Sequence, residues 1–112
     1  KAEALVKSSN SVEEEAIMIL NQLLARAGLD AVSAGDFADA QALIDRILEE
    51  RRKELAFEGH RRMDLLRNGL PLRTAQGNPG LGISSPGDQK VVLPIPQREI
   101  DLGSSLPQNP GY

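Results

Sequence analysis

The feature that most restricts the fold of this chain is an arginine on the apolar stripe of a helical segment. Between residues 37 and 55 apolar residues recur at helical spacing, and Arg51 falls on the face that contains Ile44 and Leu48. A guanidinium in such a place lowers stability unless a carboxylate neutralises it inside a larger structure. Glu54 lies three residues after Arg51, close enough along a helix for the two side chains to meet. The pattern therefore predicts a helix that belongs to a helical assembly.

Three interpretations of this charged segment are open. It can be a solvated helix, whose surface ion pairs contribute about 0.3–0.5 kcal/mol each. It can be a pair of glutamates acting as acid and base, although the intervening arginines would hold both carboxylates ionised. It can be a structural lock between helices, which we favour, formed by Arg51, Glu54, Glu58, Arg61 and Asp64. In the lock, Arg51→Ala is expected to cost about 3–5 kcal/mol if it leaves a buried glutamate unpaired.

Composition excludes several classes of function. The 112 residues suffice for one small domain, and the absence of cysteine rules out disulfides, thiolate metal sites and cysteine nucleophiles. The net charge is only -3, and the arginines alternate with glutamates, so no basic face for nucleic acid is predicted. His60 and Asp64 have a spacing that could hold a metal, but a third ligand is not evident. We therefore predict no metal, no cofactor and no nucleic-acid partner.

The first 69 residues are predicted to be helical. A helix over residues 1–7 is followed by a second that begins at a capping box of Ser11 and Glu14 and ends at Gly28. The short link between them favours an antiparallel hairpin. A long third helix is predicted from an Asp36 cap to about Phe57 or Glu58, with Phe37 on its inner face. A last short helix, residues 60–67, should turn Met63 and Leu66 inward and stop at Asn68-Gly69.

Residues 70–112 have a different character and are predicted to form an irregular tail that packs back on the helices. Residues 70–89 are rich in glycine, proline and serine, which favours irregular chain. Residues 90–93 are predicted to be extended, and residues 98–102 to form one helical turn. Three apolar side chains are expected to hold the tail in place: Ile95, Ile100 and Leu106.

Several long motifs resemble one protein family. The run Glu50-Arg51-Arg52-Lys53-Glu54-Leu55-Ala56-Phe57-Glu58-Gly59-His60-Arg61 resembles the signature helix of the SusD/RagB family. Upstream, the segment Leu20-Asn21-Gln22 with Ala25-Arg26-Ala27-Gly28-Leu29 is similar to another family motif. Downstream, the runs from Leu93 to Asp101 and from Gln108 to Tyr112 resemble the family's closing segments. The resemblance covers nearly the whole chain in order.

The resemblance implies a mainly α fold, with a tetratricopeptide-like antiparallel helical hairpin plus a long helix. It implies that the chain is the C-terminal part of a longer surface protein that captures glycans or other nutrients without turning them over. Such proteins are lipoproteins on the extracellular face of the outer membrane of Bacteroidetes-type bacteria, and their partner is a TonB-dependent outer-membrane transporter. Membrane attachment would then depend on an N-terminal lipid anchor that these residues do not include.

The resemblance does not locate a ligand site. Sugars pack on exposed aromatic rings, but Phe37 and Phe57 are in core register and are expected to be buried, which leaves Tyr112. We therefore predict that these residues form scaffold and that the ligand binds mainly elsewhere in the protein. The alternative function is a helical-hairpin module for protein interactions, which would need an exposed apolar groove on the first two helices.

Overall fold

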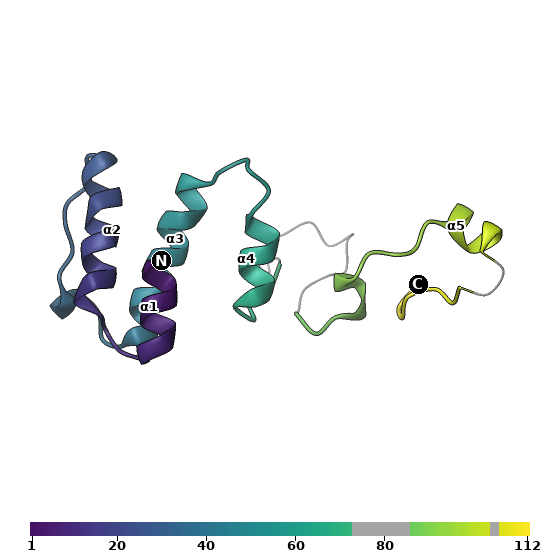
Figure 1. Cartoon of the computed structure of the whole chain (residues 1–112), viewed down its shortest axis with the longest axis horizontal. Coiled ribbons are helices and arrows are strands. Elements are labelled where there is room, and N and C mark those ends of the chain that lie inside the picture. The colour runs from purple at the N-terminus through teal and green to yellow at the C-terminus, as the bar shows by residue number, and fades with distance from the viewer. Residues whose placement is uncertain (73–85, 104–105) are drawn as a thin grey trace. The chain divides into compact units, whose positions relative to one another are not determined.

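The computed structural model describes residues 1–72, 86–103 and 106–112, and they are mainly helical, as the sequence predicts (Figure 1). No strand occurs within these described ranges. The chain divides into two compact units, residues 1–60 and 61–112. The first unit contains α1 (Ala2–Ser9), α2 (Glu14–Arg26), the 3₁₀ turn η1 (Ala34–Asp36) and α3 (Ala40–Glu54). The second contains α4 (Arg61–Arg67), the 3₁₀ turn η3 (Gln89–Val91) and α5 (Gln97–Leu102).

The core of the first unit lies where α1 packs against α2 and α3. Val6, Leu24 and Leu43 are its largest fully buried side chains, one from each helix. The other buried members follow the helical spacing of the sequence: Ala2, Ala16, Ile17, Leu20, Ile44, Ile47 and Leu48. The three helices therefore share one apolar core, while the tetratricopeptide-like pairing of the first two stays a prediction.

Two helices end in a Schellman motif, where the sequence predicts a glycine stop. At the end of α2, Gly28 has φ 70°, and the Leu29 N–H donates to the Leu24 carbonyl at 2.9 Å. At the end of α4, Gly69 has φ 65°, and the Leu70 N–H donates to the Leu65 carbonyl at the same distance. Glycine adopts this left-handed conformation without strain, so both predicted stops are confirmed.

The predicted helix starts are wrong at two places. The capping box of Ser11 does not form, because Glu13 is the N-cap of α2 and no side chain caps it. The Ser11 hydroxyl instead donates to the Glu13 carboxylate at 2.8 Å. It lies in the turn after Asn10, whose left-handed φ of 54° ends α1. The helix therefore begins too late for Ser11 to reach its first N–H groups.

The N-cap of α3 is Asp39, not Asp36. The Asp39 carboxylate accepts the Ala42 N–H at 2.8 Å. Asp36 closes a separate capping box with Ser33 around η1, which uses its carboxylate before α3 begins. Phe37 therefore precedes the helix, although its half-buried ring still packs against the core.

The predicted end of α3 is also wrong, and the error changes the environment of an aromatic ring. The helix ends at Glu54, and a turn follows in which the Glu58 N–H donates to the Leu55 carbonyl at 3.2 Å. Phe57 then takes φ 68°, which turns its side chain away from the stripe, and it is fully exposed instead of buried. Helix propensity does not distinguish the two outcomes, since Ala56, Phe57 and Glu58 all tolerate helix.

In the second unit, α4 turns a different face inward from the predicted one. Asp64 and Leu65 are buried, whereas Met63 is 63% exposed and Leu66 is only half-buried. The Arg67 guanidinium holds the buried Asp64 carboxylate with its Nε at 3.0 Å and an Nη at 2.8 Å. The prediction for Met63 is therefore wrong.

The tail of the second unit is held together by side-chain amides. Gln108 accepts the Ile95 N–H at 2.8 Å and donates to the Ile95 carbonyl at 2.9 Å, while Asn109 donates to the Leu93 carbonyl at 2.7 Å. The helical turn predicted at residues 98–102 is confirmed as α5. The extended segment predicted at residues 90–93 is wrong, because η3 occupies residues 89–91.

Two predictions about the tail are not decided. Most of the irregular segment predicted at residues 70–89 lies outside the described residues, in the range 73–85. The division into a helical part, residues 1–69, and a tail that packs back on it, residues 70–112, stays a prediction.

Candidate functional site

The buried charge of α3 is Glu50, which is not one of the five predicted lock residues. Glu50 is 4% exposed, and its carboxylate lies 3.1 Å from Arg46 and 2.8 Å from Lys53. A sequence signal was present, because Glu50 follows the buried Leu43 by seven residues and Ile47 by three. Both cations stay partly exposed, so the carboxylate is neutralised at the edge of the core.

The first unit contains three of the five predicted lock residues. Arg51 is half-buried on α3, and Glu54, at the end of the same helix, forms an ion pair with Arg26 of α2. Glu58 is exposed in the following turn, with its carboxylate 4.0 Å from the His60 imidazole. The ion pair of Arg26 with Glu54 thus joins α2 to α3, with one partner that the prediction did not include.

The other two lock residues lie on α4. Arg61 is exposed, whereas Asp64 is buried and is held by Arg67, as described above. The charged residues of α4 thus include one ion pair within the helix itself, in which the carboxylate is buried and the guanidinium is exposed. The lock as a single set of five residues stays a prediction.

A solvated ion pair is also present on α3, between Glu49 and Arg52. The Arg52 Nε donates to one Glu49 oxygen at 2.8 Å and an Nη to the other at 2.5 Å. This hydrogen bonding, followed by the charge of Glu49, raises the pKa of the Arg52 guanidinium. Both side chains are substantially exposed, so this pair fits the solvated interpretation of the helix and contributes little to stability.

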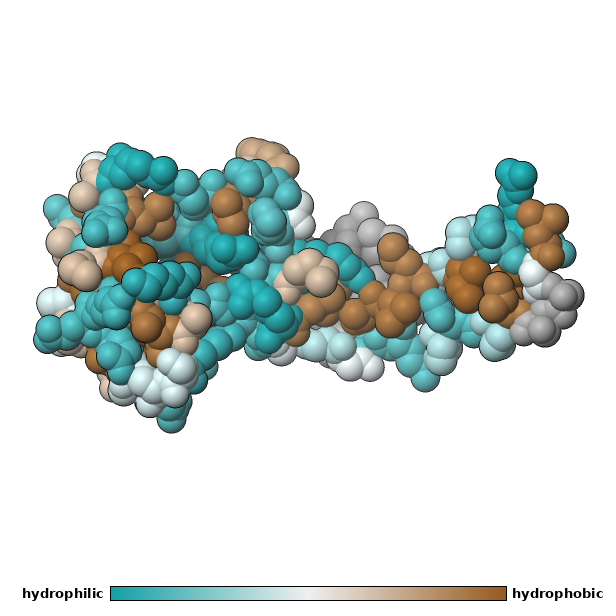
Figure 2. All heavy atoms as spheres, in the orientation of Figure 1, coloured by the Kyte–Doolittle hydropathy of each residue, from teal (hydrophilic) through white to brown (hydrophobic). Residues whose placement is uncertain are grey.

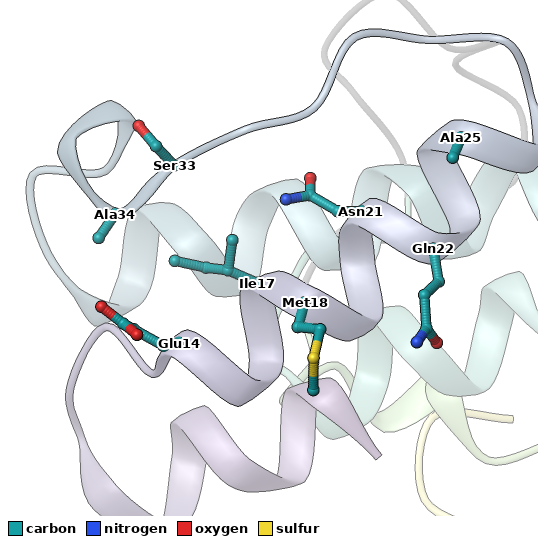
Figure 3. Close-up of a pocket in the computed structure, with 8 residues that line it drawn as sticks. All are labelled: Glu14, Ile17, Met18, Asn21, Gln22, Ala25, Ser33 and Ala34. Carbon is teal, nitrogen blue, oxygen red and sulfur yellow. The ribbon is translucent and has the colours of Figure 1, made fainter.

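A shallow groove of about 560 Å³ runs between α2 and the loop that follows it (Figure 3). We call it the first groove, and its lining consists of Glu14, Ile17, Met18, Asn21, Gln22, Ala25, Ser33 and Ala34. Figure 3 shows Ile17 and Asn21 directed toward the loop that carries Ser33 and Ala34. The same loop contains Asp36, whose pKa is lowered by hydrogen bonds from the Ser33 backbone N–H and then the Ser33 hydroxyl.

Asn21 fixes this loop on α2 with two hydrogen bonds. Its side chain donates to the Val32 carbonyl at 2.8 Å and accepts the Val32 N–H at 2.8 Å. We expect Asn21→Ala to lower the free energy of unfolding by about 1–2 kcal/mol, because two partly buried backbone groups lose their partner. Urea denaturation measures this loss. The exposed neighbour Gln22 is the matched control, and an equal loss in Gln22→Ala contradicts the role of Asn21.

A second groove, of about 540 Å³, opens between α1, α2 and α3. Its apolar lining consists of Ala2, Ile19, Leu20, Leu23, Ile47 and Leu55. Its charged lining consists of Lys1, Glu3, Arg26, Arg51 and Glu54, and Gln22 completes it. Figure 2 shows apolar side chains that reach the surface of this unit between hydrophilic ones. An apolar groove on the first helices is the feature that an interaction module requires.

The described residues offer no constellation for metal chemistry and no membrane span. No group of three or more histidine, aspartate or glutamate side chains converges within residues 1–72, 86–103 and 106–112. In the same part of the chain, no helix has the length and apolar character required to cross a bilayer.

Comparison with known proteins decides the family. The family model of the SusD family matches residues 1–112, from the first residue to the last. The chain belongs to the SusD family. No curated protein and no solved structure matches it. Membership in the SusD family is what the motifs around Arg26 and Glu54 imply.

Proposed function

We propose that this SusD-family chain belongs to a surface protein that captures glycans or other nutrients for import through a TonB-dependent transporter. The observation that carries the proposal is the match to the SusD family over residues 1–112. The protein acts by binding, and a partner barrel in the outer membrane takes up the bound nutrient. Localisation on the extracellular face of the outer membrane, with an N-terminal lipid anchor, forms part of the same proposal.

Within that protein, the residues of this chain act as scaffold. Support comes from their chemistry, because the charged side chains are engaged with one another: Glu50 with Arg46 and Lys53, and Glu54 with Arg26. A glycan site needs aromatic rings beside polar groups with free hydrogen-bonding capacity. The lining of the first groove contains no aromatic residue, and neither does that of the second. The exposed ring of Phe57 lies outside both linings, and the ligand contacts are proposed to lie mainly elsewhere in the protein.

The lock of Arg51, Glu54, Glu58, Arg61 and Asp64 is proposed as a brace between the helices of the scaffold. The half-burial of Arg51 and the ion pair from Glu54 to α2 support it. A double-mutant cycle with Arg51→Ala and Glu54→Ala tests the brace in the complete protein. We expect a coupling energy of about 0.5–1 kcal/mol, since Glu54 is partly exposed. If the losses of unfolding free energy in the two single variants add up to the loss in the double variant, Arg51 and Glu54 do not interact, and this pair is not part of the brace.

The partner is tested by purification from outer membranes under mild detergent. The protein, carrying an affinity tag, is expected to bring with it a β-barrel transporter as its principal companion. A matched preparation without the tag controls for barrels that adhere to the resin. If the purification yields a soluble partner with an amphipathic helix and no β-barrel transporter, the transport proposal is contradicted.

That second outcome would support the alternative, a helical module that binds protein segments. The observation in its favour is the second groove, which is apolar and lies on the first helices. The SusD-family match supports the nutrient-binding function more directly.

A further inference from the structure

The turn that ends α4 contains an asparagine followed directly by a glycine, Asn68 and Gly69. The side-chain amide of an asparagine can be attacked by the backbone nitrogen of the next residue. Glycine hinders this attack least, because it has no side chain. Each of the other asparagines of the chain precedes a proline, which has no N–H, or a residue with a side chain: Asn10, Asn21, Asn78 and Asn109.

The reaction at this pair is a deamidation. The Gly69 nitrogen loses its proton and attacks the Cγ atom of Asn68, and the new C–N bond closes a cyclic imide. The side-chain nitrogen of Asn68 leaves as ammonia. Water then opens the imide at either carbonyl and gives an aspartate, or an isoaspartate in which the main chain runs through the side-chain carbon. Water is the only co-reactant.

We propose that Asn68 is a site of spontaneous deamidation and that the folded end of α4 restrains the reaction. The Asn68 side-chain amide donates to the Asp64 carbonyl at 2.7 Å, and the Gly69 N–H donates to the Leu66 carbonyl at 3.1 Å. Attack requires the Gly69 nitrogen to leave its acceptor and the Asn68 side chain to turn toward it. The last turn of the helix must therefore open before the reaction occurs.

Deamidation also weakens the turn that restrains it. An aspartate at position 68 has no N–H to donate to the Asp64 carbonyl. Its charge lies four residues after the buried Asp64 carboxylate and at the negative end of the helix. An isoaspartate also lengthens the main chain, which displaces the Leu70 N–H from the Leu65 carbonyl that it meets at 2.9 Å. The modified end of α4 is therefore expected to open more often.

Peptide mass spectrometry of the complete protein tests the proposal, which goes beyond the proposed function and does not depend on it. One sample is kept folded at neutral pH and another in guanidinium chloride at the same pH and temperature. A protease that cleaves after lysine then releases residues 54–90, between Lys53 and Lys90. We expect the mass increase of an amide converted to a carboxylic acid at Asn68, at a rate about tenfold or more lower in the folded sample.

Two variants, both measured in guanidinium chloride so that their folding does not matter, identify the reaction. Asn68→Gln keeps the amide but requires a larger ring, and it is expected to abolish the mass increase at this position. Gly69→Ala places a methyl group beside the attacking nitrogen and is expected to slow the reaction. An unchanged Asn68 in the denatured parent overturns the proposal. Equal rates in the folded and denatured samples also overturn it, because the turn then gives no protection.

Discussion

Replacing Leu24 with alanine is expected to lower the free energy of unfolding by about 3–4 kcal/mol. Leu24 is fully buried in the core shared by α1, α2 and α3. Its removal loses the transfer free energy of the side chain and also leaves a cavity that the three helices close only in part. The first unit spans only residues 1–60, and a core of that size gives a small margin of stability. We therefore expect a large part of the helical structure to be lost.

Urea denaturation followed by far-ultraviolet circular dichroism measures this effect. Met18→Ala is the control on the same helix, because Met18 is 56% exposed and its loss is expected to cost less than about 0.5 kcal/mol. If the two variants unfold at the same urea concentration, Leu24 is not a core residue. The packing described for the first unit is then incorrect.

Replacing Glu50 with lysine is expected to lower the free energy of unfolding by about 2–3 kcal/mol. The substitution places a third cation beside Arg46 and Lys53, in a site where the Glu50 side chain is 5% exposed. The full cost of breaking a buried ion pair is not expected, because the Arg46 and Lys53 side chains are 37% and 50% exposed and regain water.

Two further variants serve as comparisons for Glu50→Lys. Glu50→Gln keeps the shape of the side chain and removes its charge, so we expect an intermediate loss of about 1 kcal/mol. Asp45→Lys makes the same charge change at an exposed position of α3, and a change within about 0.5 kcal/mol is expected. A Glu50→Lys variant as stable as Asp45→Lys contradicts the burial of Glu50.

The features that the sequence predicts well depend on local chemistry. Gly28 and Gly69 end their helices because the left-handed conformation excludes most other residues, whatever surrounds them. The burial of Leu20, Leu24 and Leu43 follows from the helical spacing of apolar residues, which can be recognised within each helix separately. Such features need no knowledge of the neighbouring helices.

The sequence predictions are wrong where two local conformations of the chain have similar energies. Asp36 and Asp39 are both good N-caps, and the choice is made by Ser33, which engages Asp36 in η1. Ala56 and Phe57 could continue α3, but the chain turns after Glu54 and exposes the ring. Met63 and Leu65 are both apolar, and only the packing of α4 decides that Leu65 is buried.

The ion pairs of α3 differ from the predicted ones. Glu50 pairs with Arg46 and Lys53, and Glu54 pairs with Arg26 of α2. The buried glutamate is Glu50 and not Glu54, because an apolar helix stripe is wide enough to include either position. The link from Glu54 to Arg26 joins residues 28 positions apart, and helical spacing within one segment cannot predict it.

The central claim is that the SusD-family protein containing this chain binds a nutrient and does not transform it. Isothermal titration calorimetry of the complete protein with a panel of glycans tests both parts in one measurement. The account predicts saturable heats for at least one glycan, each returning to the baseline after injection. A sustained heat flow that grows with glycan concentration and disappears in Glu54→Gln indicates turnover and contradicts the account.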